Sequence, residues 1–260
     1  MKRASSWLFP AVTGVLLIAV WYAAKRLWQL PSYVLPSPGE ILRAAWQERA
    51  TLFASVLITG RGALLGFLAA VGGGFLLSLV MAFSFRLKRS LYPYILMLQM
   101  TPVIILAPIF VLWLGQGLPA IVAVTFMICF FPVVANTTMG FMSADRGWGE
   151  LFAVCRATRW QEIRYLRVPA AMPYFLTGMK IAGTLAPIGA ITGDFLAGTQ
   201  QNGVGGIGFM TIAYFSQLKI PALFATGLTA CLLGFLFVGG VSLVHWLVLR
   251  HWHDSMVPKD

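Results

Sequence analysis

The chain has 260 residues, of which 59% are hydrophobic and 10% are charged, and its mean hydropathy is +0.81. This composition excludes an ordinary soluble globular domain. The formal net charge of +11 would suit a nucleic-acid partner. However, the Lys and Arg residues cluster at the ends of apolar segments, as membrane topology requires, and not among aromatic residues that stack on bases. We therefore expect membrane lipid, and no nucleic acid, as a partner.

A membrane-spanning helix needs roughly 20 apolar residues, and about six segments of the chain meet this requirement. They are Trp7 to Ala24, Gly62 to Phe83, Tyr92 to Trp113, Ile121 to Met142, Met172 to Leu196 and Pro221 to Leu249. The sequence thus predicts an all-α, polytopic membrane protein, built as a single domain over residues 1–260 with a transmembrane core at about residues 60–249. The first segment is long for a signal peptide and lacks a small-x-small cleavage site, so we interpret it as a retained helix.

The first two spans are separated by a proline-containing turn, Leu35-Pro36-Ser37-Pro38. Ser37 or Gly39 would begin a helix after this turn, and that helix is too polar to span, so we place it at the outer surface. The prolines of the third span, Pro102 and Pro108, would kink it.

Glycines of the second span, Gly62, Gly66 and Gly72 to Gly74, permit close contact between helices. We interpret them as packing within the chain rather than as a dimer motif. A second glycine-rich run, Gly198 to Gly208, follows the fifth span. It lacks the Gly-Lys-Ser/Thr of a phosphate-binding loop and is expected to form a flexible outer loop.

The longest charged interval, Glu150 to Pro173, joins the fourth and fifth spans and predicts two short helices exposed to water. The first would begin at Glu150, with an apolar edge of Leu151, Val154 and Cys155. The second would begin with a capping box of Thr158 and Gln161, have Trp160, Ile163 and Leu166 on one side, and end near Val168 because Pro169 follows. The pattern alone is equally compatible with a loop resting on acidic lipids and with a partner-docking element.

This interval resembles the Glu-Ala-Ala loop of binding-protein-dependent ABC transporter permeases. The family pattern falls on Glu150-Leu151-Phe152, on Arg156, and on Leu166-Arg167-Val168-Pro169, with every gap preserved. Leu-Phe stands where the family has Ala-Ala, and Arg156 stands where it has Gly. Other fragments, including Ala107-Pro108-Ile109-Phe110 and the run Phe130 to Thr137, resemble the sulfonate, taurine and nitrate branch of the family.

The resemblance implies a type I ABC importer permease with a cytoplasmic coupling helix, in a coupling loop at about residues 143–170. It implies docking on an ATP-binding subunit, which alone would use ATP, so that no cofactor is expected on this chain. A periplasmic or lipid-anchored substrate-binding protein and a second copy of the chain, as a homodimer, are the other implied partners. The residues to which it assigns the docking role are Glu150, Leu151, Phe152, Arg156, Ala157, Thr158, Trp160, Gln161 and Pro169.

The distribution of basic residues predicts the topology. Of the 19 Lys and Arg residues, thirteen fall on the predicted inner side and six on the outer side. This bias places both termini and the charged interval on the cytoplasmic side of the membrane, which the resemblance implies is a bacterial plasma (inner) membrane.

Three polar residues near the spans are candidates for the translocation path or a gate: Thr101, Asn136 and Asp194. For Asn136 an interhelical hydrogen bond is the simpler interpretation, and for Asp194 a hydrogen-bonded structural acid is favoured over a gate. An ion-coupled secondary transporter, the main alternative, would need more intramembrane charge than Asp194 provides. A membrane enzyme would need clustered His or carboxylates, and no such cluster or metal site is expected.

The resemblance implies that the solute is a small polar molecule. Members of the branch import sulfonates, taurine, nitrate and bicarbonate, and related members carry thiamine-pyrimidine or riboflavin compounds; the tail Trp252-His253-Asp254 has some similarity to the latter group.

Overall fold

The computed structural model describes residues 2–200 and 203–249, and every regular element in these ranges is a helix. The tail Trp252-His253-Asp254 therefore lies outside the described residues. In chain order the helices are α1 (Lys2–Leu27), α2 (Pro38–Gln47), α3 (Arg49–Phe83), α4 (Phe85–Met100), α5 (Val103–Leu114), α6 (Leu118–Met142), α7 (Arg146–Val154), α8 (Arg159–Glu162), the π-helical turn η1 (Ile163–Arg167), α9 (Val168–Ala197), α10 (Ile207–Ser216) and α11 (Ile220–Leu249).

Four helices in the described ranges are long and apolar enough to cross a membrane: α3, α6, α9 with its lead-in from Arg159, and α11. These correspond to the predicted second, fourth, fifth and sixth spans. Helix α3 begins already at Arg49, and Arg61 is accommodated within it because that side chain is exposed. The predicted first span lies inside α1, and the side chains of residues 2–8 lie outside the description, so that span stays a prediction.

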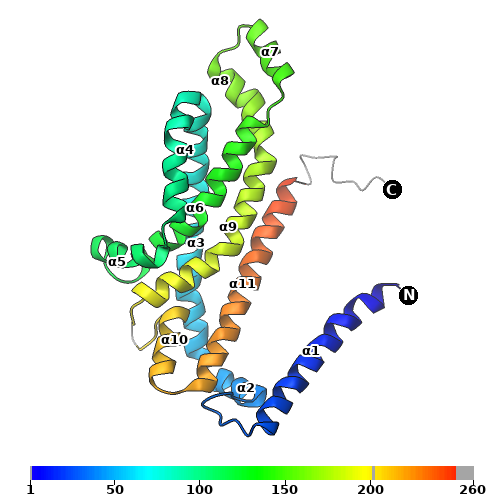
Figure 1. The fold of residues 1–260 in the computed structure, drawn as a ribbon, viewed down its shortest axis with the longest axis vertical. Coiled ribbons are helices and arrows are strands. Elements are labelled where there is room, and N and C mark those ends of the chain that lie inside the picture. Colours follow the sequence, from blue (N-terminus) through cyan, green and yellow to red (C-terminus); the bar gives the residue numbers. More distant parts are fainter. Residues whose placement is uncertain (1, 201–202, 250–260) are drawn as a thin grey trace.

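The third span differs from the prediction. It consists of α4 and α5, which meet at 98° across a break at Thr101 and Pro102, so that α5 projects from the side of the bundle (Figure 1). Thr101 has φ −72° and ψ 124°, the extended conformation that a following proline imposes. The prediction that the third span is one kinked helix was therefore wrong, because Pro102 ends α4 instead of bending it.

Helix α6 packs between α3 and α9 at the centre of the bundle. Glycines allow this close approach. A Cβ at Gly66 of α3 would lie 2.4 Å from Thr125 Cβ of α6, and a Cβ at Gly178 of α9 would lie 2.9 Å from the Pro132 carbonyl oxygen. Packing of the α3 glycines within the chain is thus confirmed for Gly62, Gly66 and Gly74, whereas Gly72 has no neighbour within 4 Å.

Helices α1 and α2 meet at the end of the molecule opposite α7 and α8 (Figure 1). Helix α2 begins after Ser37, which forms a capping box with Glu40, so the predicted start at Ser37 is confirmed. The Lys25 ammonium of α1 lies 2.7 Å from the Glu40 carboxylate, and the Trp21 indole N–H donates to the Pro36 carbonyl over 3.1 Å. Elsewhere α1 extends away from the bundle.

Candidate functional site

A compact unit of two short helices, α7 and α8, projects from one end of the bundle between α6 and α9 (Figure 1). Asp145 caps α7, because its carboxylate accepts the Gly147 N–H over 2.6 Å. The expectation that this helix begins at Glu150 was wrong: the cap lies one turn earlier, where Gly147 and Gly149 weakened the helical pattern. Glu150 instead lies exposed in the middle of α7.

Helix α8 begins with the predicted capping box, which is confirmed. The Gln161 N–H donates to Thr158 Oγ1 over 3.3 Å, and the Thr158 N–H donates to Gln161 Oε1 over 2.7 Å. This reciprocal pair satisfies donors that the first turn of a helix otherwise leaves without partners.

Arg156 occupies a left-handed position between the two helices, with φ +51°. The Arg156 N–H donates to the Ala153 carbonyl and the Ala157 N–H donates to the Phe152 carbonyl, which is the Schellman pattern of a helix end. The residue in this position is usually glycine, because a Cβ is strained at positive φ. The left-handed backbone at this position therefore explains why the family pattern has glycine there. Arg156 adopts the same conformation at some conformational cost.

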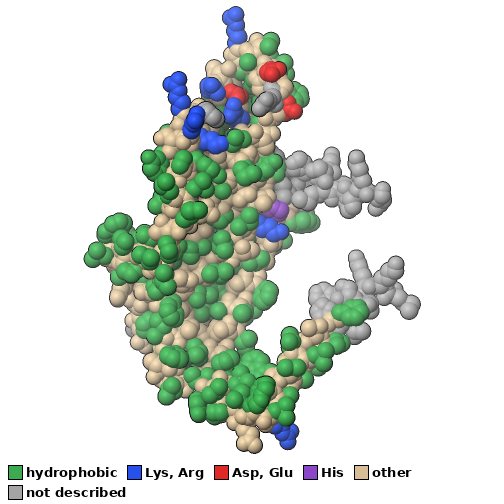
Figure 2. All heavy atoms as spheres, in the orientation of Figure 1, with side chains coloured by type: hydrophobic (Ala, Val, Ile, Leu, Met, Phe, Trp, Pro, Cys, Tyr) green, Lys and Arg blue, Asp and Glu red, His purple; other side chains and the backbone are tan. Residues whose placement is uncertain are grey.

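The unit exposes apolar side chains to its surroundings. Val154 is 81% exposed, Trp160 is 55% exposed and Leu151 is 48% exposed. A shallow groove of about 320 Å³ between the two helices is lined by Leu151, Phe152, Cys155, Ala157, Gln161 and Tyr165. Basic and acidic side chains gather around the same end of the molecule (Figure 2). An exposed apolar patch with a charged rim is typical of a protein-docking surface.

The unit is anchored to the bundle through α8. Ile163 is 2% exposed, the Trp160 ring stacks on Phe83 at the end of α3 with 5.9 Å between centroids, and the Arg167 guanidinium donates to Glu162 over 2.6 and 2.8 Å. These contacts fix the position of α8 relative to both α3 and α9.

No break separates α8 from α9, contrary to the expected end near Val168. Residues Arg159 to Ala197 form one helical run of 39 residues. The turn η1 widens the helix just before Pro169, with the Val168 N–H donating to the Ile163 carbonyl. This π-helical turn lets the chain pass a proline, which lacks an N–H and clashes with the preceding turn of a regular helix. Pro169 consequently lies within α9 and outside the exposed unit, whereas the other eight predicted docking residues all lie in it.

The far end of the same helical run carries Asp194, which is 1% exposed. Its Oδ2 accepts the Phe209 N–H over 3.2 Å and the Thr59 hydroxyl over 3.4 Å, and Thr59 Oγ1 in turn accepts the Ile207 N–H over 2.8 Å. These bonds join α9, α3 and α10, as expected of a structural acid. A role in gating stays a prediction.

The glycine run after α9 was expected to be a flexible outer loop, and for residues 205–208 that was wrong. Gly205, Gly206 and Gly208 are buried. A Cβ at Gly206 would lie 2.2 Å from Asp194 Oδ2, and one at Gly208 would lie 2.4 Å from the Ile191 carbonyl oxygen. The glycines are needed because the backbone passes directly against α9; residues 201–202 of the run lie outside the description.

The remaining path candidates lie apart from the docking unit. Thr101 lies at the break between α4 and α5, and its hydroxyl donates to the Met97 carbonyl over 3.3 Å. The Asn136 amide donates to the Pro132 carbonyl of its own helix over 2.8 Å, so the interhelical hydrogen bond expected for it was wrong. Sequence reasoning missed Thr59, whose partners on α9 and α10 are distant in the chain and carry no local signal.

Residues 62–249 match the family described as "Binding-protein-dependent transport system inner membrane component". The curated proteins that are similar to this chain over nearly its whole length include the following three. The formylaminopyrimidine transport permease protein ThiX of Halalkalibacterium halodurans is 35% identical over 96% of this chain and 98% of its own. The riboflavin transport system permease protein RibX of Chloroflexus aurantiacus is 31% identical over 94% and 90%. The putative aliphatic sulfonates transport permease protein SsuC of Bacillus subtilis is 28% identical over 98% and 91%.

Two solved structures share the fold. An amino acid ABC transporter chain has a TM-score of 0.60 at 16% identity, covering 79% of this chain and 95% of that one. A chain of the MetNI methionine ABC transporter has a TM-score of 0.56 at 16% identity, covering 82% and 98%. The expected type I importer fold is thereby confirmed.

Proposed function

Because the chain belongs to the family of binding-protein-dependent transport system inner membrane components, we propose that its α7–α8 unit is the docking element through which a separate ATP-binding subunit drives transport. The family assignment makes the chain a permease subunit of an ABC importer and does not support the ion-coupled alternative. ATP would be used by the partner subunit. Two copies of the chain would enclose the path, a substrate-binding protein would deliver solute to the outer end, and both termini would be cytoplasmic.

The observation that carries this proposal is the continuity of α8 with α9. A run of 39 residues is about 58 Å long at 1.5 Å per residue, nearly twice the hydrocarbon thickness of a bilayer. A force applied to α8 at Thr158 would therefore reach Asp194 along one unbroken helical run, which includes the π-helical turn η1 and the internal prolines Pro173 and Pro187. At that far end the hydrogen bonds of Asp194 transfer the displacement to α3 and α10. Such rigid-body motion of packed helices is a standard route to alternating access.

The exposed tip of the unit supplies the surface that a partner would cover. Val154 and Leu151 present apolar area, while Arg156, Arg159 and Arg164 are exposed around it. Burying such a tip in a groove gains hydrophobic free energy at its centre, and the cations on its rim would pair with acidic side chains of the partner.

For the solute, we propose a heteroaromatic compound of the thiamine-pyrimidine or riboflavin class. In support, the ThiX and RibX relatives are 35% and 31% identical to this chain, compared with 28% for SsuC and 26% for a nitrate import permease protein. Competition for ATP-dependent uptake between formylaminopyrimidine, riboflavin, taurine and nitrate would separate the two classes.

Docking is tested by placing a charge on the exposed apolar tip. Val154→Glu should abolish co-purification with the ATP-binding subunit and ATP-dependent uptake in proteoliposomes, because the new carboxylate would be desolvated in the interface. Deletion of Arg156 to Gln161, or replacement of Glu150, should likewise abolish coupling while the chain remains inserted in the membrane.

The matched control is Leu42→Glu. Leu42 is 66% exposed on α2 at the opposite end of the molecule, so this variant makes the same change in charge without touching the docking unit. Unaltered ATPase binding and uptake in Val154→Glu would show that the unit is not the docking element.

A further inference from the structure

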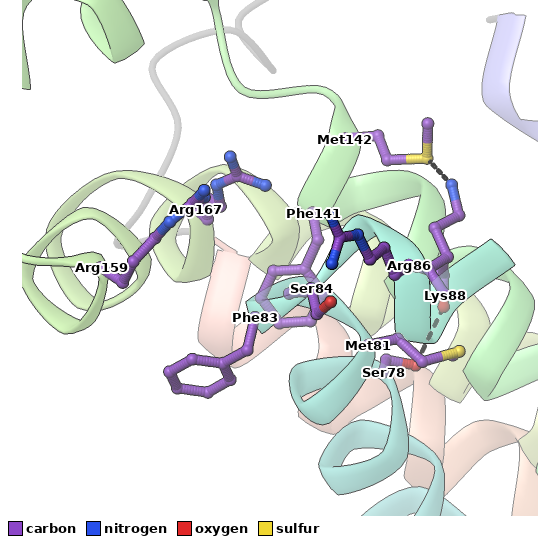
Figure 3. Close-up of a pocket in the computed structure, with 12 residues that line it drawn as sticks. Ser78, Met81, Phe83, Ser84, Arg86, Lys88, Phe141, Met142, Arg159 and Arg167 are labelled. Carbon is purple, nitrogen blue, oxygen red and sulfur yellow. Dashed lines mark hydrogen bonds between the residues drawn. The ribbon is translucent and has the colours of Figure 1, made fainter. Parts of the chain in front are cut away.

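A basic cavity of about 440 Å³ lies next to the docking unit, where α3 and α6 end. Four cationic side chains from three elements line it: Arg86 and Lys88 of α4, Arg159 of α8 and Arg167 of η1. Figure 3 shows Arg86 and Arg167 on opposite sides of the cavity, with Ser84 and Phe141 between them. The sequence gives no sign of this cluster, because the four residues lie in two segments far apart in the chain.

The charge in this cavity is not balanced by the protein. Glu162 is the acidic partner of both Arg159, at 3.8 Å, and Arg167, at 2.6 Å. Arg86 and Lys88 have no acidic partner among the described residues, and Lys88 instead contacts the Met142 sulfur and the Tyr92 ring. Two of the four cations thus share one carboxylate and the other two have none among the described residues, so the cavity would bind an anion favourably.

The hydroxyl groups on the floor of the cavity already donate hydrogen bonds within the protein. The Thr138 hydroxyl donates to Ser78 Oγ over 3.3 Å, and the Ser78 hydroxyl donates to the Gly74 carbonyl over 2.8 Å. Recognition is therefore left to the guanidinium and ammonium groups, which bind phosphate oxygens through charge-assisted hydrogen bonds. The cavity also lies at the N-terminal end of α4, where the helix dipole adds a positive potential.

The position of the cavity relative to the membrane points to a lipid. Phe83 and Met142, the last residues of the apolar helices α3 and α6, both line it, so it lies where the hydrocarbon region gives way to headgroups. Leu76, Val80 and Phe83, at i, i+4 and i+7 on one face of α3, are 61%, 48% and 39% exposed. This apolar stripe leads to the cavity and could carry an acyl chain while the headgroup enters it.

We propose that this cavity binds the phosphodiester headgroup of an anionic phospholipid. Basic pockets between spanning helices at the cytoplasmic side recognise such headgroups through the same physical chemistry. Because Arg159 and Arg167 belong to the segment that carries the docking unit, a bound headgroup would connect α4 to that unit and restrict its motion. The two proposals share Arg159, but the lipid site can be tested at Arg86 and Lys88 of α4, which the docking proposal does not use.

The test uses the full-length chain reconstituted in vesicles of equal parts phosphatidylcholine and phosphatidylglycerol, then extracted in mild detergent and examined by native mass spectrometry. The wild-type chain should retain phosphatidylglycerol in preference to phosphatidylcholine. Arg86→Gln/Lys88→Gln should reduce this retention about tenfold, because two partly exposed charge contacts are lost. A second variant, Ala82→Phe, fills the cavity without changing any charge and should reduce retention as well.

The matched control, Arg43→Gln/Arg89→Gln, removes the same charge from residues that do not line the cavity and should retain lipid like the wild type. Equal losses in the control and cavity variants would overturn the proposal, as would retention without preference between the two lipids. Displacement of the bound lipid by inorganic phosphate at the same concentration would assign the cavity to a soluble phosphate instead. Loss of the preference only when the ATP-binding subunit is present would assign the cavity to that subunit.

Discussion

Two glycines of α3 allow one chemical change to be tested in opposite environments. Gly66→Ala would place a Cβ 2.4 Å from Thr125 Cβ and 2.7 Å from its Cγ2, whereas carbon atoms normally pack at roughly 3.5–4.0 Å. Rotation of the Thr125 side chain cannot relieve this contact, because its Cβ is fixed by the backbone of α6, and the Val122 carbonyl oxygen lies 3.0 Å from the same position. Helices α3 and α6 must therefore separate by about 1 Å, the amount missing from that contact distance.

The expected cost follows from two opposing effects. Overpacking of this kind costs about 1–3 kcal/mol, and the higher helix propensity of alanine returns up to about 1 kcal/mol. The net destabilisation of Gly66→Ala is thus about 1–2 kcal/mol, which corresponds to a Tm about 3–6 °C lower for a chain of this size. Gly72→Ala, with no heavy atom within 4 Å, loses nothing in packing and should leave the Tm unchanged or raise it by about 2 °C.

The assay is the thermal stability of the chain in detergent, measured as the fraction of a fluorescently tagged chain that remains monodisperse after heating. Both variants change glycine to alanine in the same helix, so differences in expression or propensity cancel. Equal Tm values for the two variants, or a higher Tm for Gly66→Ala, would refute the packing of α3 against α6 described above.

Three further outcomes are expected. Arg156→Gly should stabilise the chain by up to about 1 kcal/mol in the same assay, because it removes the strain of φ +51°, and Arg156→Ala, which keeps the Cβ, should not. Hydrogen bonds from the Lys25 ammonium, which has the larger effect, and from the Ser37 N–H lower the pKa of Glu40 from 4.5 to about 2. A carboxylate with a lowered pKa contributes stability that is complete above pH 4.5 and is lost as the pH falls to about 2. A spin-label distance between α1 and α2 should therefore stay constant from neutral pH to 4.5 and increase as pH approaches 2, and Glu40→Gln should lengthen it at neutral pH; a transition already complete at 4.5 would contradict this. In a variant with Cys129 and Cys231 replaced by serine, the exposed Cys155 should react with a membrane-impermeant maleimide only from the cytoplasmic side, and labelling from outside would reverse the topology.

Local signals were enough for much of the fold. Apolar length predicted α6, α9 and α11 to within about four residues at each end, since a span must fill the hydrocarbon region whatever it packs against. The capping box at Thr158 was equally readable, because it depends on two side chains three residues apart, and Ser37 was one of the two helix starts predicted after the proline turn. The eight residues proposed for docking that lie in the α7–α8 unit were predicted from the preserved spacing of a family pattern.

The effect of each proline on its helix could not be predicted from the neighbouring sequence. The same residue type ends α4 at Pro102, is accommodated inside α6 at Pro132 and is bypassed by a π-helical turn at Pro169. A proline removes one donor and imposes one steric restriction in every case. Which response follows depends on the helices packed around it, and the sequence near the proline does not specify them.

By itself the sequence determined that this chain is a polytopic helical membrane protein with an exposed basic unit between its fourth and fifth spans, because hydropathy, charge and capping act over short stretches of chain. The permease assignment came from the resemblance of that unit to a family pattern. Only the tertiary structure decided that α8 continues into α9 without a break, that a glycine run encloses Asp194, and that Arg86 and Lys88 share a cavity with Arg159 and Arg167. Each of these depends on the approach of segments far apart in sequence. Such approaches are set by the packing of whole helices against one another, which leaves no periodic pattern in either segment alone.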